Sequence, residues 1–171
     1  IANKKAFCYT MCIIALVAGI TVNPINRGTD ILYKTEIAQK IQEISSKDKS
    51  ALWIGNTNLA GQYLVANGVK TLNGVNSYPN FEWLNIVDPE GKFNEVYNRY
   101  AHIFIDLGDE TNFELEAPDV YRATLTNQNI KDLGIKYYFT NQKCDENTQQ
   151  DFNMEEIYAN SEKSQYIYQL K

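Results

Sequence analysis

The sequence predicts a mixed α/β domain, either α+β or three-layer α/β, in which helices flank one mixed β-sheet and one transmembrane helix comes first. Three observations lead to this expectation. A short apolar run, 51–55, and a second candidate strand, 69–74, enclose a helical pattern at the spacing of a βαβ unit with parallel strands. Residues 112–125 and 155–171 have the patterns of antiparallel strands. A stretch without charge, residues 6–22, precedes them all.

The composition is that of a folded, acidic domain. Aromatic residues make up 12% of the 171 residues, which is too many for a disordered chain. The formal net charge is −5, and Lys and Arg are not clustered, so we expect no nucleic-acid partner. Cys8, Cys12 and Cys144 suit neither a disulfide framework nor a metal site, because no histidine lies near them in sequence. We therefore expect neither a metal nor another cofactor.

Residues 1–24 are predicted to form a transmembrane helix. Lys4 and Lys5 precede the apolar residues 6–22, whose length is near the lower limit for crossing about 30 Å of hydrocarbon. Pro24 ends the helix, because a proline disfavours helical geometry in the residue before it. A cleaved signal peptide and a buried core helix are the alternatives, and the first lacks a good cleavage site.

The charges around this segment predict its orientation. The lysines mark the cytoplasmic end, and the acidic domain, residues 25–171, then lies outside the cytoplasm. The chain begins with Ile1 rather than Met. We expect it to be the C-terminal part of a longer membrane protein, located at the cell membrane, with the bilayer and the remaining membrane part as partners.

Four elements are predicted in the first half of the domain. Residues 30–44 have apolar residues at three- and four-residue spacing, which indicates an amphipathic helix. "ALWIG" (51–55) is typical of a buried strand. Residues 56–68 suit a helix that Gly68 ends, and 69–74 a second strand. The stretch 76–100 is expected to be a proline-bearing aromatic loop with one short helical piece at 93–97.

The second half alternates strands with short connections. Residues 101–107 form the clearest strand pattern, and Asn127 and Gly134 are expected to bound a short helix. Residues 142–154 are expected to be a polar loop. The remaining predicted strands are 112–118, 119–125, 135–141 and two within 155–171. The predicted core is Ile41, Leu52, Trp53, Ile54, Leu64, Leu72, Ile103, Phe104, Ile105, Leu133, Ile135, Tyr138 and Phe139.

Sequence motifs for catalysis are missing. The loop "GNTNLAG" after residues 51–54 could offer backbone amides to an anion, but an ordinary capped turn explains it as well. Asp88 and Glu90 resemble a carboxylate pair, yet Pro89 favours a β-turn there. His102 is the only histidine, so a hydrolase using it or Asp88 is one alternative, and a structural histidine is the other.

The stretch 76–103 is the predicted binding region, because it combines aromatic rings with amide and basic side chains. Such rings stack on the apolar faces of sugars, and the polar groups bond to hydroxyls; the alternative is a packed loop. The candidate binding residues are Tyr78, Trp83, Asn98, Arg99, Tyr100 and His102, with Asn76, Asn80 and Phe81 nearby. We predict no catalytic residue.

Two segments carry a family resemblance. "LVANGVKTLNGVNSYPNFEWLNIVDPEGKFNEVYNRYAHI" and "LGIKYYFTN" resemble the C-terminal region of bacterial multi-spanning membrane proteins, which are similar in layout to GT-C-type glycosyltransferases. The resemblance implies an accessory extracytoplasmic domain without its own catalytic centre, in a protein of the cell envelope that transfers sugars from lipid-linked donors to surface glycans. Glycan or lipid-linked sugar is then an expected partner. The alternative is a surface binding or structural domain held by a single span.

Overall fold

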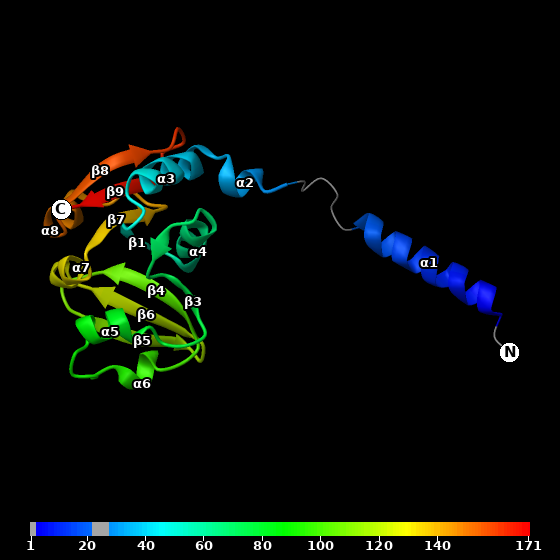
Figure 1. The fold of residues 1–171 in the computed structure, drawn as a ribbon, viewed down its shortest axis with the longest axis horizontal. Coiled ribbons are helices and arrows are strands. Elements are labelled where there is room, and N and C mark those ends of the chain that lie inside the picture. The colour runs from blue at the N-terminus through cyan, green and yellow to red at the C-terminus, as the bar shows by residue number, and fades with distance from the viewer. Residues whose placement is uncertain (1–2, 22–27) are drawn as a thin grey trace. The chain divides into compact units, whose positions relative to one another are not determined.

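The chain divides into two units, Ile1–Ile31 and Leu32–Lys171. A computed structural model describes residues 3–21 and 28–171 (Figure 1). Helix α1 (Lys4–Thr21) belongs to the first unit, and every strand described belongs to the second. The short helix α2 (Asp30–Tyr33) spans the boundary between the two units.

Helix α1 exposes apolar side chains along its length, among them Phe7, Ile13 and Leu16. No helix in the described part of the chain is long and apolar enough to cross a membrane, so the predicted transmembrane span is not supported. The part of α1 that the structure describes after its two lysines is about 24 Å long at 1.5 Å per residue, short of about 30 Å of hydrocarbon. Residues 22–24 of the predicted span lie outside the described residues.

The second unit has two mixed sheets, so the prediction of a single sheet is wrong. Sheet A has the order β2-β1-β7-β9-β8, and sheet B has the order β3-β4-β6-β5. The strands of sheet A are β1 (Leu52–Gly55), β2 (Lys70–Thr71), β7 (Ile135–Thr140), β8 (Met154–Ala159) and β9 (Tyr166–Leu170). Those of sheet B are β3 (Gly74–Asn76), β4 (Ala101–Leu107), β5 (Asn112–Ala117) and β6 (Val120–Leu125).

The division into two sheets begins inside the predicted strand 69–74. Residue Asn73 is buried there and bonds to the backbone of Gly55 through both ends of its side-chain amide. Gly74 follows with a φ of 150°, a conformation that L side chains rarely adopt. The chain therefore leaves sheet A after β2 and enters sheet B as β3.

Helices α3 (Glu36–Lys47) and α4 (Asn58–Ala66) pack against one face of sheet A. Ile37, Ile41 and Ile44 of α3 meet the buried Trp53 of β1 in one apolar cluster. The predicted helix 30–44 is broken into α2 and α3, because Thr35 is extended and caps α3 by accepting a bond from the amide of Ala38. The predicted βαβ unit is confirmed: α4 joins β1 to the parallel strand β2.

Sheet B is covered on one face by α5 (Phe81–Val87) and α6 (Asn94–Tyr97), as Figure 1 shows. Helix α5 was expected as loop. It forms because Asn80 caps its first turn and Trp83, Leu84 and Val87 turn one apolar face to the sheet. The turn predicted at Asp88–Gly91 and the short helix after it are present.

Two further helices complete the fold. Helix α7 (Asn127–Leu133) carries the chain from sheet B to sheet A; Thr126 caps it, one residue before the predicted Asn127. Helix α8 (Glu146–Asp151) lies where a polar loop was predicted, because Asp145 caps a turn that buries no side chain. Side chains from both sheets meet in a shared core. Of the predicted core residues, only Leu72, Phe104 and Leu133 are half-buried rather than buried.

Candidate functional site

A crevice opens at the carboxyl ends of β1 and β7. These two strands are parallel neighbours, but α4 carries the chain from β1 to β2 on the other side, and β7 arrives from sheet B. Such a change of direction leaves the loops after two adjacent strands diverging, and open α/β sheets bind ligands there. The crevice has a volume of about 460 Å³, within the range of small-molecule sites.

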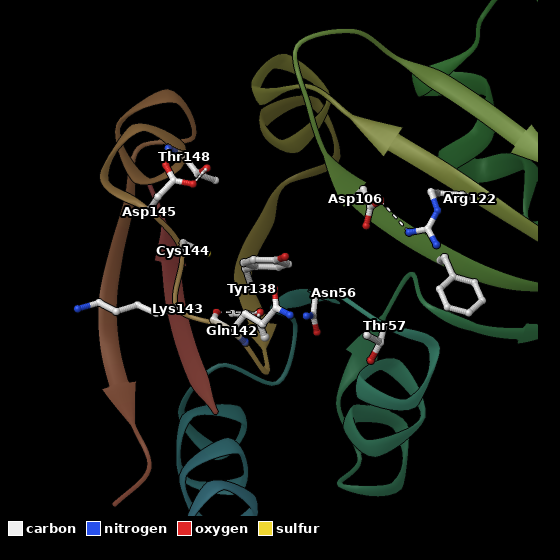
Figure 2. A pocket seen from close by; sticks show the side chains of 12 residues that line it. Asn56, Thr57, Asp106, Arg122, Tyr138, Gln142, Lys143, Cys144, Asp145 and Thr148 are labelled. Atoms are coloured by element: carbon white, nitrogen blue, oxygen red, sulfur yellow. Dashed lines mark hydrogen bonds and ion pairs between the residues drawn. The ribbon is translucent and has the colours of Figure 1, made fainter. Parts of the chain in front are cut away.

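Sheet B supplies one wall of the crevice (Figure 2). Arg122 of β6 donates from Nη1 to Asp106 of β4 (2.7 Å) and from Nε to Glu116 of β5 (2.6 Å). Its guanidinium carbon lies 5.2 Å from the ring centre of Phe104, the register partner of Arg122. The hydrogen bonds to the two carboxylates raise the pKa of Arg122. The guanidinium is therefore charged and fixed in position.

The loop after β7 forms the opposite wall. Thr140 is buried, and its hydroxyl donates to the backbone carbonyl of Gln142 and accepts from the backbone amide of Gln142 (both 3.0 Å). The amide of Cys144 donates to the hydroxyl of Tyr168 on β9 (3.1 Å). Asp145 accepts from the amide and hydroxyl of Thr148 at the start of α8. The wall is thus held by its own bonds, and the side-chain amide of Gln142 points into the crevice (Figure 2).

Asn56 forms the floor between the two walls (Figure 2). Its Oδ1 atom is buried and meets no hydrogen-bond donor in residues 3–21 and 28–171. Its backbone amide donates to the carbonyl of Phe139, which continues the ladder of β1 and β7. A buried acceptor without a donor costs free energy, and a ligand hydroxyl would satisfy it.

The titrating groups of the crevice suit binding rather than proton transfer. Burial raises the pKa of Cys144 to about 11, so its thiol stays protonated at neutral pH and is a poor nucleophile. Burial also raises the pKa of Tyr138. The amide and hydroxyl of Thr148 lower the pKa of Asp145, which is then a carboxylate and not a general acid. Asp106 forms an ion pair with Arg122.

The predicted residues His102 and Tyr100 lie together beside the crevice. His102 is on the same half-exposed face of β4 as Phe104 and Asp106. Its Nδ1 accepts from Nδ2 of Asn58 (3.1 Å) at the start of α4, and its ring stands edge-on to that of Tyr100 at 6.0 Å. In the tautomer whose Nδ1 accepts from Asn58, the imidazole hydrogen lies on Nε2.

The other predicted binding residues are not brought to the crevice. Trp83 is 4% exposed and stacks on Phe113 in the core. Arg99 donates to the carbonyls of Glu95 and Pro118 and so joins α6 to the β5–β6 turn. Asn98 ends α6, and Tyr78 is 84% exposed before α5. All four residues belong to the long connection between β3 and β4.

The residues of the crevice were not predicted as binding residues. Asn56 belongs to the loop "GNTNLAG", which the sequence did mark as a strand-to-helix turn. Asp106 and Arg122 carried a weaker signal, because alternation within β4 and β6 places both on the polar face of their strands. Their pairing depends on the parallel register of β4 and β6, which brings together these two residues, 16 positions apart in the sequence.

In fold and site, the protein is an α/β domain with a ligand-sized crevice at the edge of a mixed sheet. Residues 31–171 match the family model described as "Domain of unknown function (DUF7654)", and the chain belongs to this family. The match corresponds to the second unit of the structure. No curated protein matches the chain, and no solved structure matches it. The described residues contain no group of three or more His, Cys, Asp or Glu side chains placed to hold a metal ion.

Proposed function

We propose that this domain is a non-catalytic carbohydrate-binding domain of a membrane-attached, cell-envelope protein, and that its crevice receives a sugar. The observation that carries the proposal is the composition of the crevice. One opening is faced by a fixed arginine–carboxylate pair, by the side-chain amide of Gln142 and by Oδ1 of Asn56, an acceptor without a donor in the described part of the chain. Phe104 and Tyr138 supply aromatic surface beside them.

Sugar hydroxyls match this set of groups better than an anion does. Each hydroxyl both donates and accepts a hydrogen bond, so it can bond to a carboxylate and a guanidinium held side by side. A phosphate would meet the carboxylates of Asp106 and Asp145, and the charge of Arg122 is already balanced by Asp106 and Glu116. Like charge at such short range is unfavourable. Lys143 also lines the crevice, but its ammonium group is directed away from the other lining side chains (Figure 2). The crevice therefore favours a neutral, hydroxyl-rich ligand.

The proposed test measures sugar binding by saturation-transfer NMR. The full chain, in a zwitterionic detergent free of sugar, is titrated with glucose, galactose, mannose and N-acetylglucosamine. We expect at least one to bind, and Arg122→Ala to weaken that binding about tenfold or more, because a hydrogen bond from a charged group contributes about 1.5–3 kcal/mol. Gln142→Ala removes an exposed side chain that makes no hydrogen bond with residues 3–21 or 28–171, and it is expected to weaken binding several-fold.

The matched control is Lys131→Ala, which removes an exposed cation of α7 outside the crevice and is expected to leave sugar affinity unchanged. Failure of all four sugars to bind, or equal affinity in the unmodified chain and both crevice variants, would contradict the proposal. Circular dichroism of each variant separates a loss of binding from a loss of fold.

We also propose that residues 1–24 attach the protein to a membrane, with the second unit on the extracytoplasmic side. The support is the exposure of apolar side chains around α1, including Phe7, Ile13 and Ile20, with two lysines at its start. Exposed apolar area of this kind is stabilised by lipid. The family resemblance suggests a parent protein of several spans that acts on cell-surface glycans.

Flotation with phosphatidylcholine–phosphatidylglycerol vesicles tests this attachment. We expect the full chain to float with the vesicles and the double variant Ile13→Asp/Val17→Asp to remain at the bottom of the gradient, because two charges on α1 oppose insertion. Equal flotation of both proteins would exclude α1 as the attachment.

A further inference from the structure

The face of β4 that supplies Phe104 and Asp106 to the crevice extends along the strand to His102. His102, Phe104 and Asp106 alternate with buried residues, so their side chains share one half-exposed face. The distance from Asp106 to His102 along the strand is roughly 13 Å, at about 3.3 Å per residue. Thr57 lines the crevice, and its neighbour Asn58 bonds to His102, so the start of α4 borders this face of β4.

The His102 end presents its own set of groups for hydroxyls. The Nε2 atom of His102 lies 4.0 Å from Oδ2 of Asp119, too far for a direct hydrogen bond. One hydroxyl between them would accept from Nε2–H and donate to the carboxylate. Tyr100, 49% exposed, adds an aromatic ring beside this pair. The arrangement repeats the chemistry of the crevice, with an aromatic ring next to a donor and a carboxylate.

We infer that the ligand is an oligosaccharide chain: one sugar unit occupies the crevice, and the chain follows β4 to a second contact at His102, Asp119 and Tyr100. The inference rests on the proposed function and extends it from a single sugar to a chain. The distance of roughly 13 Å between Asp106 and His102 along β4 is longer than a single sugar ring. A ligand that spans both binds more tightly, because the second contact forms without a second loss of translational freedom.

Calorimetry with ligands of different length tests this inference. The full chain is titrated with glucose and N-acetylglucosamine, and with maltotetraose, cellotetraose and chitotetraose. We expect at least one tetrasaccharide to bind about tenfold or more tightly than its own monosaccharide, the effect of one or two added hydrogen bonds and a ring contact. In His102→Ala and in Tyr100→Ala this ratio of affinities is expected to fall toward one.

The outcomes separate the two proposals. Absence of binding by every mono- and tetrasaccharide overturns the proposed function. Binding of a monosaccharide with no gain from the tetrasaccharides, or a gain that both variants retain, overturns the extended site and leaves the crevice in place. Tyr100→Ala removes an exposed ring, so this variant provides the test of the second contact if His102→Ala fails to fold. Tyr33→Ala, which removes another exposed tyrosine, on α2, is the matched control and is expected to keep the full ratio.

Discussion

Asn73→Ala is expected to lower the free energy of unfolding by about 3 kcal/mol or more. Asn73 is 3% exposed, and its Oδ1 accepts from the amide of Gly55 (2.7 Å) while its Nδ2 donates to the Gly55 carbonyl (2.9 Å). Alanine leaves both backbone groups buried without a partner, and each such group costs about 1–3 kcal/mol. Urea denaturation followed by circular dichroism measures the change.

Asn76→Ala is the matched control for this substitution. Asn76 lies three residues further on, in β3, and its side chain makes no hydrogen bond within the described residues. Its replacement is expected to change the free energy of unfolding by less than about 0.5 kcal/mol. Equal losses of unfolding free energy for the two variants would show that the bonds from Asn73 to Gly55 do not cause the loss in Asn73→Ala.

Asn73 also shows why the two-sheet fold was missed from the sequence. Residues 69–74 were interpreted as one short strand, and nothing in the local pattern marks Asn73 as buried. Its burial depends on Gly55, 18 residues earlier, which becomes its neighbour only when β1 and β2 pair. Apolar periodicity reports which residues face a core, but a break that is caused by a distant hydrogen bond leaves no periodic signal.

The elements that were predicted well are those whose causes are local. Strand β4 was found with its observed bounds, because Ile103 and Ile105 alternate with polar or half-exposed neighbours. Helix α4 was located between its preceding strand and Gly68, whose φ of 75° favours glycine. Helix α8 was missed because it buries no side chain and therefore has no apolar face to detect.

The candidate site was harder to predict than the fold, because its residues come from separate elements. The search for aromatic and amide groups within one stretch located Tyr100 and His102, which border the open face of sheet B. It did not find Arg122, whose partners Asp106 and Glu116 lie on two other strands. Such a set becomes visible only after strand order and register are known.

Gly61→Ala is expected to lower the free energy of unfolding by at least about 2 kcal/mol. A β-carbon on Gly61 would lie 2.2 Å from the β-carbon of Asn73, a contact that cannot exist without a shift of α4 or of the segment before β3. Overpacking of this kind costs about 1–3 kcal/mol and sometimes more. The loss is expected even though alanine favours a helix over glycine by about 1 kcal/mol.

The double variant Gly61→Ala/Asn73→Gly decides whether this contact is the cause. Without a β-carbon at position 73, the nearest remaining atom of that residue is its carbonyl carbon, 3.3 Å from the new β-carbon, a contact that small movements relieve. In the Asn73→Gly background the substitution at Gly61 is therefore expected to be neutral or to stabilise by less than about 1 kcal/mol. Urea denaturation of the four proteins gives the coupling free energy. An equal loss of stability in both backgrounds would mean that α4 tolerates no side chain at position 61 for a reason other than Asn73. The close approach of α4 to the segment that separates the two sheets would then not explain why position 61 is a glycine.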